Sequence, residues 1–419
     1  FISLEIGSFP LIWILHLALY LGSFIVTFRE SGGVPKSIKH LWPEFLLCGC
    51  FLYLVGSIHW LAIFGHLTVF FLICLVSHGT LYELRPEPAK LTNFYLSSAL
   101  GGWIVGAMVS LAVPYIFKGL YEYPLILSLF GILFFICRPD SLKTFMPGAP
   151  VKHFCVRWTV SLLLTTLVLL GTKSAFDNHL QFQHRNFFGT YKIKDFYSQN
   201  HEYPAMRKLI HGNTIHGAQF LEPASELVPL LYYYDGGAIA QAFQVKSTHE
   251  HIAIIGLGTG LATVHANRND KITYYEIDPD NEKIARRWFS FLDKCRGSVH
   301  VIVGDARLSM QKATIADPQY DIIFIDAFTG DGIPTHLLTK EAIETYLSRL
   351  NDDGIILFHV SNRYYDLRPV IKATAELMGL HAVANIRVEK KYLKSYEVSP
   401  RCVVLAREAQ TLGPLLEKG

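Results

Sequence analysis

Residues 251–260 read HIAIIGLGTG, an apolar run that leads into three alternate glycines. A buried strand followed by a glycine turn is typical of the first strand–turn–helix unit of a doubly wound parallel sheet. Residues 274–279, YYEIDP, repeat the pattern with an apolar strand that ends in acidic residues. The stretch therefore predicts an α/β fold whose first ligand-binding turn contains Gly256, Gly258 and Gly260.

Three further apolar runs continue this pattern and also end in polar residues: HVIVGDA at 300–306, DIIFIDA at 321–327 and GIILFHVSN at 354–362. Helices are predicted after the first two strands, at 261–267 and at 279–292. Two last strands, near 381–388 and 401–408, are expected to close the sheet as an antiparallel pair. Alternating strands and helices indicate a parallel sheet, so residues 249–419 are predicted to form a Rossmann-like domain.

The first 171 residues have a different composition. They hold ten Lys and Arg and seven Asp and Glu, whereas the remainder holds twenty-eight of each. About 20 apolar residues cross a bilayer core, and apolar runs lie at 9–28, 43–76, 91–117, 123–137 and 154–170. The second run is long enough for two helices with a hinge near 56–59. The sequence thus predicts an α-helical transmembrane domain of about six helices at 1–171, with five as the alternative.

Between these two parts, residues 172–248 are polar and aromatic. Short alternating stretches, YKIKDFY at 191–197 and NTIHGAQF at 213–220, indicate β-hairpins. This segment is predicted to form a small β-rich subdomain that precedes the Rossmann-like domain.

Polar side chains at the carboxyl ends of the predicted strands should converge, because ligands of such sheets bind at that edge. They belong to the glycine turn and to Glu276, Asp305, Asp326 and His359. A dinucleotide fingerprint has Gly or Ala where Leu261 stands, which disfavours NAD.

Two of these acids narrow the choice of ligand. Glu276 suits a ribose diol, and Asp305 beside the backbone N–H of Ala306 suits the amino group of adenine. Acids that merely cap helices would explain any one of these residues, but poorly explain the ordered set. The set favours S-adenosylmethionine or its decarboxylated form as co-substrate.

The stretches HGAQF, IIGLGTG, YYEIDP, VGDAR and DIIFIDAFTGDGIP make the last 230 or so residues resemble the spermidine synthase (polyamine aminopropyltransferase) family. In the first part EIGSFPLIWILHLALYL, SHGTLYELRPEPAKLTNFYL and EYPLILSL resemble bacterial proteins described as fused major-facilitator/spermidine synthase-like. Such proteins usually carry more helices upstream, and this chain begins at Phe1 without a starting Met.

The resemblance implies a role for each matching residue. The glycine turn and Glu276 hold the nucleoside, Asp305 reads the adenine, and Gln219 covers the ligand. Asp326 takes the proton from the attacking amine, a step that amine alkylation needs because an ammonium has no free lone pair. The tyrosines that line the amine channel match Tyr232 and Tyr233.

Three departures from the family pattern bear on the activity. Thr259 stands where the family has an Asp that grips the free amine of the decarboxylated cofactor. Asp331 is separated from Asp326 by AFTG, so its role in binding the amine is in doubt. His211 and His216 stand where acidic residues commonly occur, which makes a weaker attractant for polyamines.

Three functions therefore remain open. The first is a membrane-anchored transferase that moves an aminopropyl group to a small amine or another nucleophile. The second is an S-adenosylmethionine-dependent methyltransferase, with Asp326, His359 or His216 as base. The third is a membrane subunit whose synthase-like domain binds a ligand or partner without turnover.

The remaining expectations concern location and partners. We expect an integral protein of the bacterial inner membrane, in contact with the lipid bilayer and able to join a homo-oligomer or a membrane complex. The cofactor requires a cytoplasmic catalytic half, although the loop charges favour the other side in a six-helix arrangement. Equal numbers of acidic and basic residues after position 171 disfavour nucleic acid as a partner. Scattered cysteines without a CxxC pair disfavour a metal site.

Overall fold

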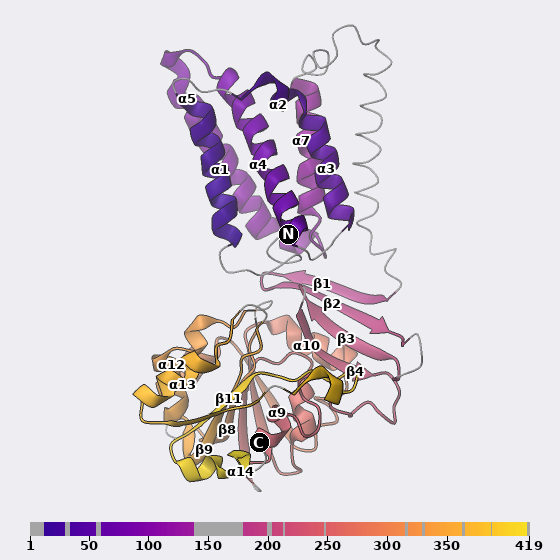
Figure 1. Ribbon diagram of the computed structural model, residues 1–419, viewed down its shortest axis with the longest axis vertical. Coiled ribbons are helices and arrows are strands. Elements are labelled where there is room, and N and C mark those ends of the chain that lie inside the picture. Colours follow the sequence, from indigo (N-terminus) through magenta and orange to yellow (C-terminus); the bar gives the residue numbers. More distant parts are fainter. Residues whose placement is uncertain are drawn as a thin grey trace. The chain divides into compact units, whose positions relative to one another are not determined.

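The structure is a computed structural model of the 419-residue chain (Figure 1). It describes residues 12–29, 34–55, 60–137, 179–198, 203–212, 214–246, 249–314, 317–328, 332–362, 365–386 and 388–416. The chain divides into two compact units. The first comprises Phe1–Asn178 with Gln183–Thr190, and the second comprises His179–Phe182 with Tyr191–Gly419.

Up to Cys137, the described part of the first unit is helical. Its elements are α1 (Ile12–Phe28), α2 (Lys36–His40), α3 (Trp42–Val55), α4 (Trp60–Glu83), α5 (Leu91–Ala107), the π-helical turn η3 (Met108–Ala112), α6 (Val113–Ile116) and α7 (Glu122–Cys137). Within the apolar run 43–76, α3 ends at Val55 and α4 begins at Trp60; the predicted hinge at 56–59 lies outside the described residues.

Two helical stretches of this unit, Leu61–Glu83 and Pro88–Ile116, are long and apolar enough to cross a membrane by length and composition. The described part therefore contains fewer such spans than the six predicted. The physical reason is length: α7 has 16 residues and so extends only about 24 Å. The predicted span at 154–170 lies outside the described residues.

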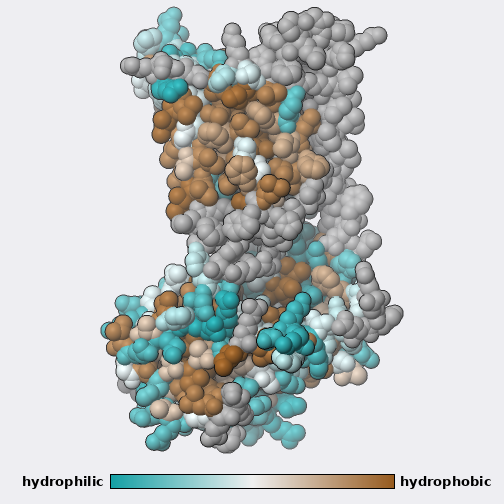
Figure 2. Space-filling view, viewed as in Figure 1, coloured by the Kyte–Doolittle hydropathy of each residue, from teal (hydrophilic) through white to brown (hydrophobic). Residues whose placement is uncertain are grey.

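Apolar side chains cover much of the outer face of these helices, as Figure 2 shows. Leu61 is 81% exposed and Trp103 is 70% exposed. Polar groups between the helices are instead paired: Ser23 Oγ lies 2.7 Å from His78 Nδ1, and the Tyr123 hydroxyl lies 2.9 Å from His66 Nδ1. The helices thus place apolar groups outward and pair polar groups inward.

The predicted hairpins form a four-stranded sheet in the order β1-β2-β3-β4. The strands are β1 (Leu180–Asn186), β2 (Gly189–Phe196), β3 (Met206–His211) and β4 (Thr214–Phe220), and β2, β3 and β4 pair antiparallel. Alternate residues of β2, such as Tyr191 and Ile193, are buried. This period of two is the reason the segment folds as strands.

The Rossmann-like domain contains a seven-stranded sheet in the order β10-β11-β9-β8-β5-β6-β7. Its strands are β5 (His251–Ile255), β6 (Lys271–Glu276), β7 (Ser298–Val303), β8 (Tyr320–Ile325), β9 (Leu350–His359), β10 (His381–Ala384) and β11 (Cys402–Ala406). The strands from β5 to β9 pair parallel, and β9, β11 and β10 pair antiparallel, as the sequence predicted.

Both faces of this sheet are buried, because alternate residues of each strand enter two separate hydrophobic clusters. Ile254 and Phe324 belong to one cluster, and their neighbours Ile255 and Ile325 belong to the other. Helices α9 (Ala238–Phe243) and α10 (Pro279–Trp288) contribute to the first cluster. Helices α11 (Ala306–Gln311), α12 (Lys340–Ser348) and α13 (Arg368–Leu377) contribute to the second.

Two predicted helices differ from the structure. Residues 261–267 form a short 3-10 helix, Leu261–His265, in which the Thr263 hydroxyl donates back to the Gly260 carbonyl at 2.8 Å. Helix α10 ends at Trp288 instead of continuing to 292, because Phe289 turns extended and buries its ring in the first cluster. Tertiary burial of that ring outweighs local helix propensity.

Candidate functional site

The glycine turn follows β5 in a conformation that glycine adopts without strain. Gly256, Gly258 and Gly260 have φ values of +96°, +53° and +79°. A Cβ added to Gly256 would lie 2.6 Å from the backbone carbonyl oxygen of Asp326, and one added to Gly258 would lie 2.6 Å from that of His216. The turn therefore packs closely against the end of β8 and against β4.

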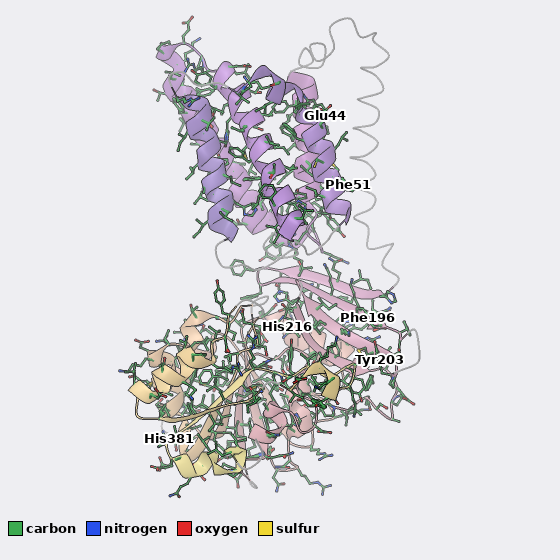
Figure 3. All side chains as sticks on the ribbon, viewed as in Figure 1. Glu44, Phe51, Phe196, Tyr203, His216 and His381 are labelled. Atoms are coloured by element: carbon green, nitrogen blue, oxygen red, sulfur yellow. The ribbon has the colours of Figure 1, made fainter. Side chains whose placement is uncertain are left out.

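A second close contact joins β4 to the same turn. A Cβ on Gly217 would lie 2.1 Å from Thr259 Oγ1. That hydroxyl oxygen and Nε2 of His216, a β4 residue labelled in Figure 3, are buried and have no hydrogen-bond partner within the described part of the chain.

Burial, followed by the neighbouring His211, lowers the pKa of His216 to about 3, so its imidazole is neutral at physiological pH. An unpaired buried polar atom costs about 1–3 kcal/mol. The contact between β4 and the turn is therefore suited to the polar part of a ligand that would pair with these two atoms.

Glu276, at the end of β6, braces the glycine turn. Its carboxylate accepts the backbone N–H groups of Leu257 and Asp278, both at 2.9 Å, and the side-chain amide of Asn281 at 3.0 Å. Burial raises its pKa, and these hydrogen bonds offset part of that effect. The residue thus fixes the turn, in addition to the role in ribose binding that the sequence predicted.

Asp305, at the end of β7, caps helix α11. One carboxylate oxygen accepts the Leu308 N–H at 2.9 Å, and the other accepts Nε2–H of His336 at 3.0 Å. The predicted neighbour Ala306 is buried as the first residue of that helix. Helix capping is the alternative to adenine binding that the sequence left open for Asp305. His336 is a second partner of the same carboxylate.

Ile277 and His336 were missed at the sequence level. Ile277 is 50% exposed although it lies between two acids, Glu276 and Asp278, at the end of a buried strand. Its exposed apolar side chain is available to a ligand at that edge of the sheet, and the EID triplet was the available signal. A lone histidine after the predicted catalytic loop carried no comparable signal.

Asp326, directly after β8, lies in a network of side chains. Its Oδ2 accepts the Tyr233 hydroxyl, and its Oδ1 lies 2.7 Å from His359 Nδ1. His359 Nε2 lies 2.8 Å from Ser361 Oγ. Burial, and next the charge of Asp326, raise the pKa of Tyr233 well above its ordinary value, so this hydroxyl stays a proton donor.

Aromatic rings surround this network. The imidazole of His359 lies 4.8 Å from the ring of Tyr232 and 4.9 Å from the ring of Phe328. The structure thus brings Asp326, Tyr232, Tyr233 and His359 together beside the glycine turn. From the sequence, His359 was singled out as a polar residue at a strand end. In the structure it contacts the predicted base, Asp326.

Two predicted residues are not placed with this group. The Gln219 side chain faces the segment after α10, where its Nε2 donates to Ser290 Oγ at 2.5 Å and to the Glu226 carbonyl at 3.2 Å. Asp331 lies outside the described residues.

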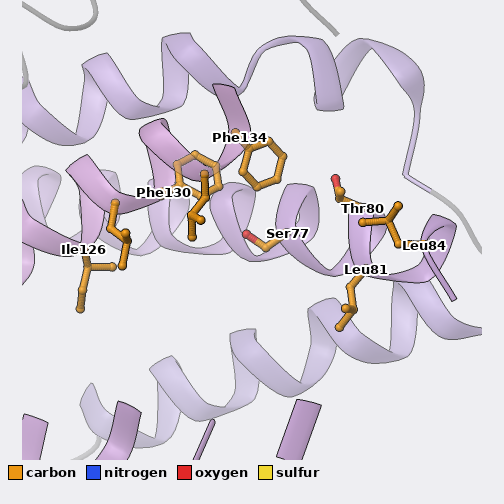
Figure 4. A pocket seen from close by; sticks show the side chains of 9 residues that line it. Ser77, Thr80, Leu81, Leu84, Ile126, Phe130 and Phe134 are labelled. Atoms are coloured by element: carbon orange, nitrogen blue, oxygen red, sulfur yellow. The ribbon is translucent and has the colours of Figure 1, made fainter. Parts of the chain in front are cut away.

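A pocket of about 380 Å³ lies in the first unit, between α4 and α7 (Figure 4). Its walls are apolar apart from the hydroxyls of Ser77 and Thr80. It offers no acid or base for catalysis. Within the described ranges, no group of three or more His, Cys, Asp and Glu side chains could hold a metal ion.

Comparison with known proteins adds to this geometry. Residues 255–360 match the model of a methyltransferase domain family. A polyamine aminopropyltransferase from Vibrio vulnificus is 36% identical over 124 residues, which are 28% of this chain and 40% of that protein. The chain thus spans about 40% of the length of this relative.

Solved structures give similar neighbours at low similarity. A spermidine synthase from Thermotoga maritima has a TM-score of 0.40 and 15% identity, covering 57% of this chain and 76% of that one. Human methyltransferase-like protein 13 in complex with SAH has a TM-score of 0.34 and 22% identity, covering 43% and 86%. By the sequence matches, the C-terminal region of this chain resembles polyamine aminopropyltransferases and methyltransferase domains.

Proposed function

We propose that this chain is a transferase that binds S-adenosylmethionine or its decarboxylated form and alkylates a nucleophile deprotonated by Asp326. The observation that carries the proposal is the position of Asp326. Its backbone packs on Gly256 of the glycine turn, and its carboxylate is held by Tyr233 and His359. A base is thereby fixed next to the turn that would carry the nucleoside.

The residues present fit such a co-substrate. A Cβ at Gly256 or Gly258 would meet the backbone carbonyl oxygen of Asp326 or of His216, so glycine lets the turn pack directly against the end of β8 and against β4. Glu276 and Asp305 end neighbouring strands and would contact the ribose and the adenine. Ile277 would lie under the purine. Thr259 Oγ1 and His216 Nε2 are buried without a hydrogen-bond partner in the described part of the chain, and they would pair with the ligand.

Each side chain of this region has a separate role in the proposed transfer. Asp326 receives the proton of the acceptor, which frees the lone pair that attacks carbon. Tyr233 and His359 keep the carboxylate in one orientation, which places the base before the reaction begins. Tyr232 and Phe328 exclude water from this side of the network. The bound sulfonium supplies the electrophilic carbon and its own leaving group.

Aminopropyl transfer to an amine is the first form of this proposal. The polyamine aminopropyltransferase match, 36% identical over 124 residues, supports it. The acceptor would be a small amine, drawn to the site by the carboxylate of Asp326.

Methyl transfer is the second form, and one observation favours it. Thr259 is 1% exposed and its hydroxyl carries no charge. A neutral group at this place neither attracts an ammonium tail nor repels a carboxylate, so the ordinary cofactor can bind. The match of residues 255–360 to a methyltransferase domain agrees with this form.

The helical unit would anchor the enzyme in a bilayer through Leu61–Glu83 and Pro88–Ile116. The outward apolar side chains of this unit support that part of the proposal, because lipid tails would cover them. A cytoplasmic site in a bacterial inner membrane and assembly into a homo-oligomer or membrane complex belong to the same proposal.

The test uses the full chain in detergent and two measurements. Titration with S-adenosylmethionine, decarboxylated S-adenosylmethionine and methylthioadenosine measures binding. Preference for the decarboxylated form supports aminopropyl transfer, and preference for the carboxylated form supports methyl transfer. The absence of binding to all three would overturn the proposal in favour of a subunit without turnover.

Asp326→Asn tests the base. We expect the variant to bind cofactor like the wild type and to lose turnover by about 10²–10⁴-fold, the usual contribution of a general base. Asp293→Asn, at an exposed acid paired with Arg286, is the control and should keep full activity. Turnover of Asp326→Asn near the wild-type rate would remove Asp326 from this role.

A further inference from the structure

A chain of hydrogen bonds runs from the backbone of the strand-end segment before β11 to Asp326. The Arg401 N–H donates to Ser361 Oγ at 2.9 Å, Ser361 Oγ lies 2.8 Å from His359 Nε2, and His359 Nδ1 lies 2.7 Å from Asp326 Oδ1. Ser361 was not among the residues that the sequence singled out. The chain crosses from β11 over β9 to β8, three neighbouring strands of the sheet.

Counting hydrogens along this chain fixes the tautomer of the imidazole. Because Ser361 Oγ accepts the Arg401 N–H, its own hydroxyl hydrogen is available for His359 Nε2. The carboxylate of Asp326 can only accept hydrogen bonds, so the Nδ1 of His359 carries the hydrogen of that contact, and Nε2 is left to accept the hydroxyl hydrogen of Ser361. The opposite tautomer would set the lone pair of Nδ1 against an oxygen of Asp326.

The surroundings hold the imidazole in this orientation. His359 is 3% exposed and pairs with Cys402 in the sheet, and the rings of Tyr232 and Phe328 lie on it at 4.8 and 4.9 Å. A ring flip would break the hydrogen bonds at both nitrogens in a buried place, which costs about 1–3 kcal/mol for each unpaired group.

We propose that His359 and Ser361 are positioning residues that direct the carboxylate of Asp326 toward the acceptor; this rests on the proposed function. Asp326 accepts one hydrogen bond at Oδ1 from His359 and one at Oδ2 from Tyr233. Both neighbours point hydrogens at the carboxylate, so neither of them can take up the proton that Asp326 gains. The lone pairs left on the two oxygens face the remaining direction, and the proton enters there from the acceptor.

The first test needs no acceptor substrate. The full chain in detergent, labelled with ¹⁵N-histidine, reports the protonation of each ring nitrogen, and loss of a signal pair in His359→Asn assigns His359. We expect a protonated Nδ1 and an unprotonated Nε2. Ser361→Ala removes the hydrogen bond at Nε2 and should shift the Nε2 signal of His359 while Nδ1 stays protonated, whereas Ser361→Thr, which keeps the hydroxyl, should retain the wild-type spectrum. A protonated Nε2 in the wild type would overturn the proposal.

The second test separates positioning from a merely structural role. The amide of Asn can replace the Nδ1–H donor, and that of Gln reaches toward the Nε2 place instead. His359→Asn should therefore keep turnover within about tenfold, and His359→Gln should lose about 10–100-fold, the usual range for supporting residues around a site. Unchanged kcat in both Ser361→Ala and His359→Gln would also overturn the proposal.

Cofactor affinity distinguishes this failure from failure of the proposed function. All these variants should bind S-adenosylmethionine like the wild type, because neither residue contacts the glycine turn. If the wild type itself binds none of the adenosyl ligands, the proposed function fails, whatever the histidine spectrum shows.

Discussion

Strand β8 carries an acid at each end, and the surroundings of the two acids differ. Near its amino end, Asp321 accepts the backbone N–H groups of Glu250 and His251 at 2.8 and 3.2 Å and the amide of Asn351 at 2.8 Å. The ammonium of Lys246 lies at 3.3 Å. Both carboxylate oxygens of Asp321 are occupied by groups of the protein, so this acid leaves no position for a ligand.

The carboxyl edge is incomplete. Asp326 is held by two side chains, and beside it the buried Thr259 Oγ1 and His216 Nε2 have no partner in the described part of the chain. Ile277 exposes half of its surface there. Unpaired polar atoms and an exposed apolar side chain at one edge indicate a ligand site, whereas paired groups at the other edge indicate a structural role.

The largest effect that would test this contrast is the loss of folding stability when Asp321, at the amino edge, is replaced. Asp321→Ala removes a charged acceptor and leaves two partly buried backbone N–H groups unpaired, so we expect a loss of about 2–4 kcal/mol in the free energy of unfolding. Thermal and denaturant unfolding of the full chain measure it. Cofactor affinity should stay unchanged. Asp352→Ala, at an exposed acid on the next strand, should stay within about 0.5 kcal/mol.

The pairing of Asp321 should also make the stability of the fold depend on pH. Burial alone would raise the pKa of Asp321, but hydrogen bonds from Glu250, Asn351 and His251 lower it to about 2. A lowered carboxyl pKa stabilises the fold above the unfolded value near 4, and that stabilisation is lost as pH falls from about 4 to about 2. Asp321→Asn should lack this part of the acid transition. An unchanged transition would mean that Asp321 is not the paired acid described here.

The second effect concerns the glycine turn, where we expect Gly256→Ala to weaken cofactor binding by at least about tenfold, or 1.4 kcal/mol. A Cβ there meets the Asp326 carbonyl oxygen at 2.6 Å, so the turn and the end of β8 must separate. Titration with S-adenosylmethionine measures the change.

Gly379 provides the control for backbone strain. It also has a positive φ, +70°, but a Cβ would meet nothing within 4 Å. Gly379→Ala should therefore cost about 1 kcal/mol of stability from the left-handed conformation alone, with no effect on binding. Equal binding by both variants would show that the turn is not the ligand cradle.

The sheet could be predicted because its determinants are local. Apolar strands such as DIIFI and the glycines after HIAII predict the strands and the binding edge, and Asp326 was singled out by its place at a strand end. The partners of Asp326 could not be predicted the same way. The Arg401 N–H reaches Ser361 only because β9 and β11 pair in one register, and register depends on residues distant in sequence.

The helical part was predicted less well for a related reason. Hydropathy identifies apolar runs, but it does not say where a helix ends. Helices α1 and α3 have only 17 and 14 residues. Helix length depends on turns, caps and packing between helices, so the count of spans exceeded what the described helices support.

The smallest expected effect on stability lies in the glycine turn itself, where Thr259 and Thr263 differ in one respect. Both are almost fully buried, at 1% and 2% exposure. The Thr263 hydroxyl donates to the carbonyl oxygens of Gly260 and Phe291, whereas Thr259 Oγ1 has no partner within the described residues. Thr263→Val should therefore cost about 1 kcal/mol, the usual net value of a hydrogen bond.

Thr259→Val should change stability by less than about 0.5 kcal/mol, or raise it slightly, because an unpaired buried hydroxyl is replaced by a methyl group of similar size. For cofactor binding, Thr259→Val should have the larger effect of the two variants, since the Thr259 hydroxyl is free to pair with a ligand. We expect about a threefold to tenfold weaker affinity, the value of one hydrogen bond. If Thr259→Val binds like the wild type, a buried water rather than a ligand satisfies that hydroxyl, and the carboxyl edge is less incomplete than its unpaired atoms indicate.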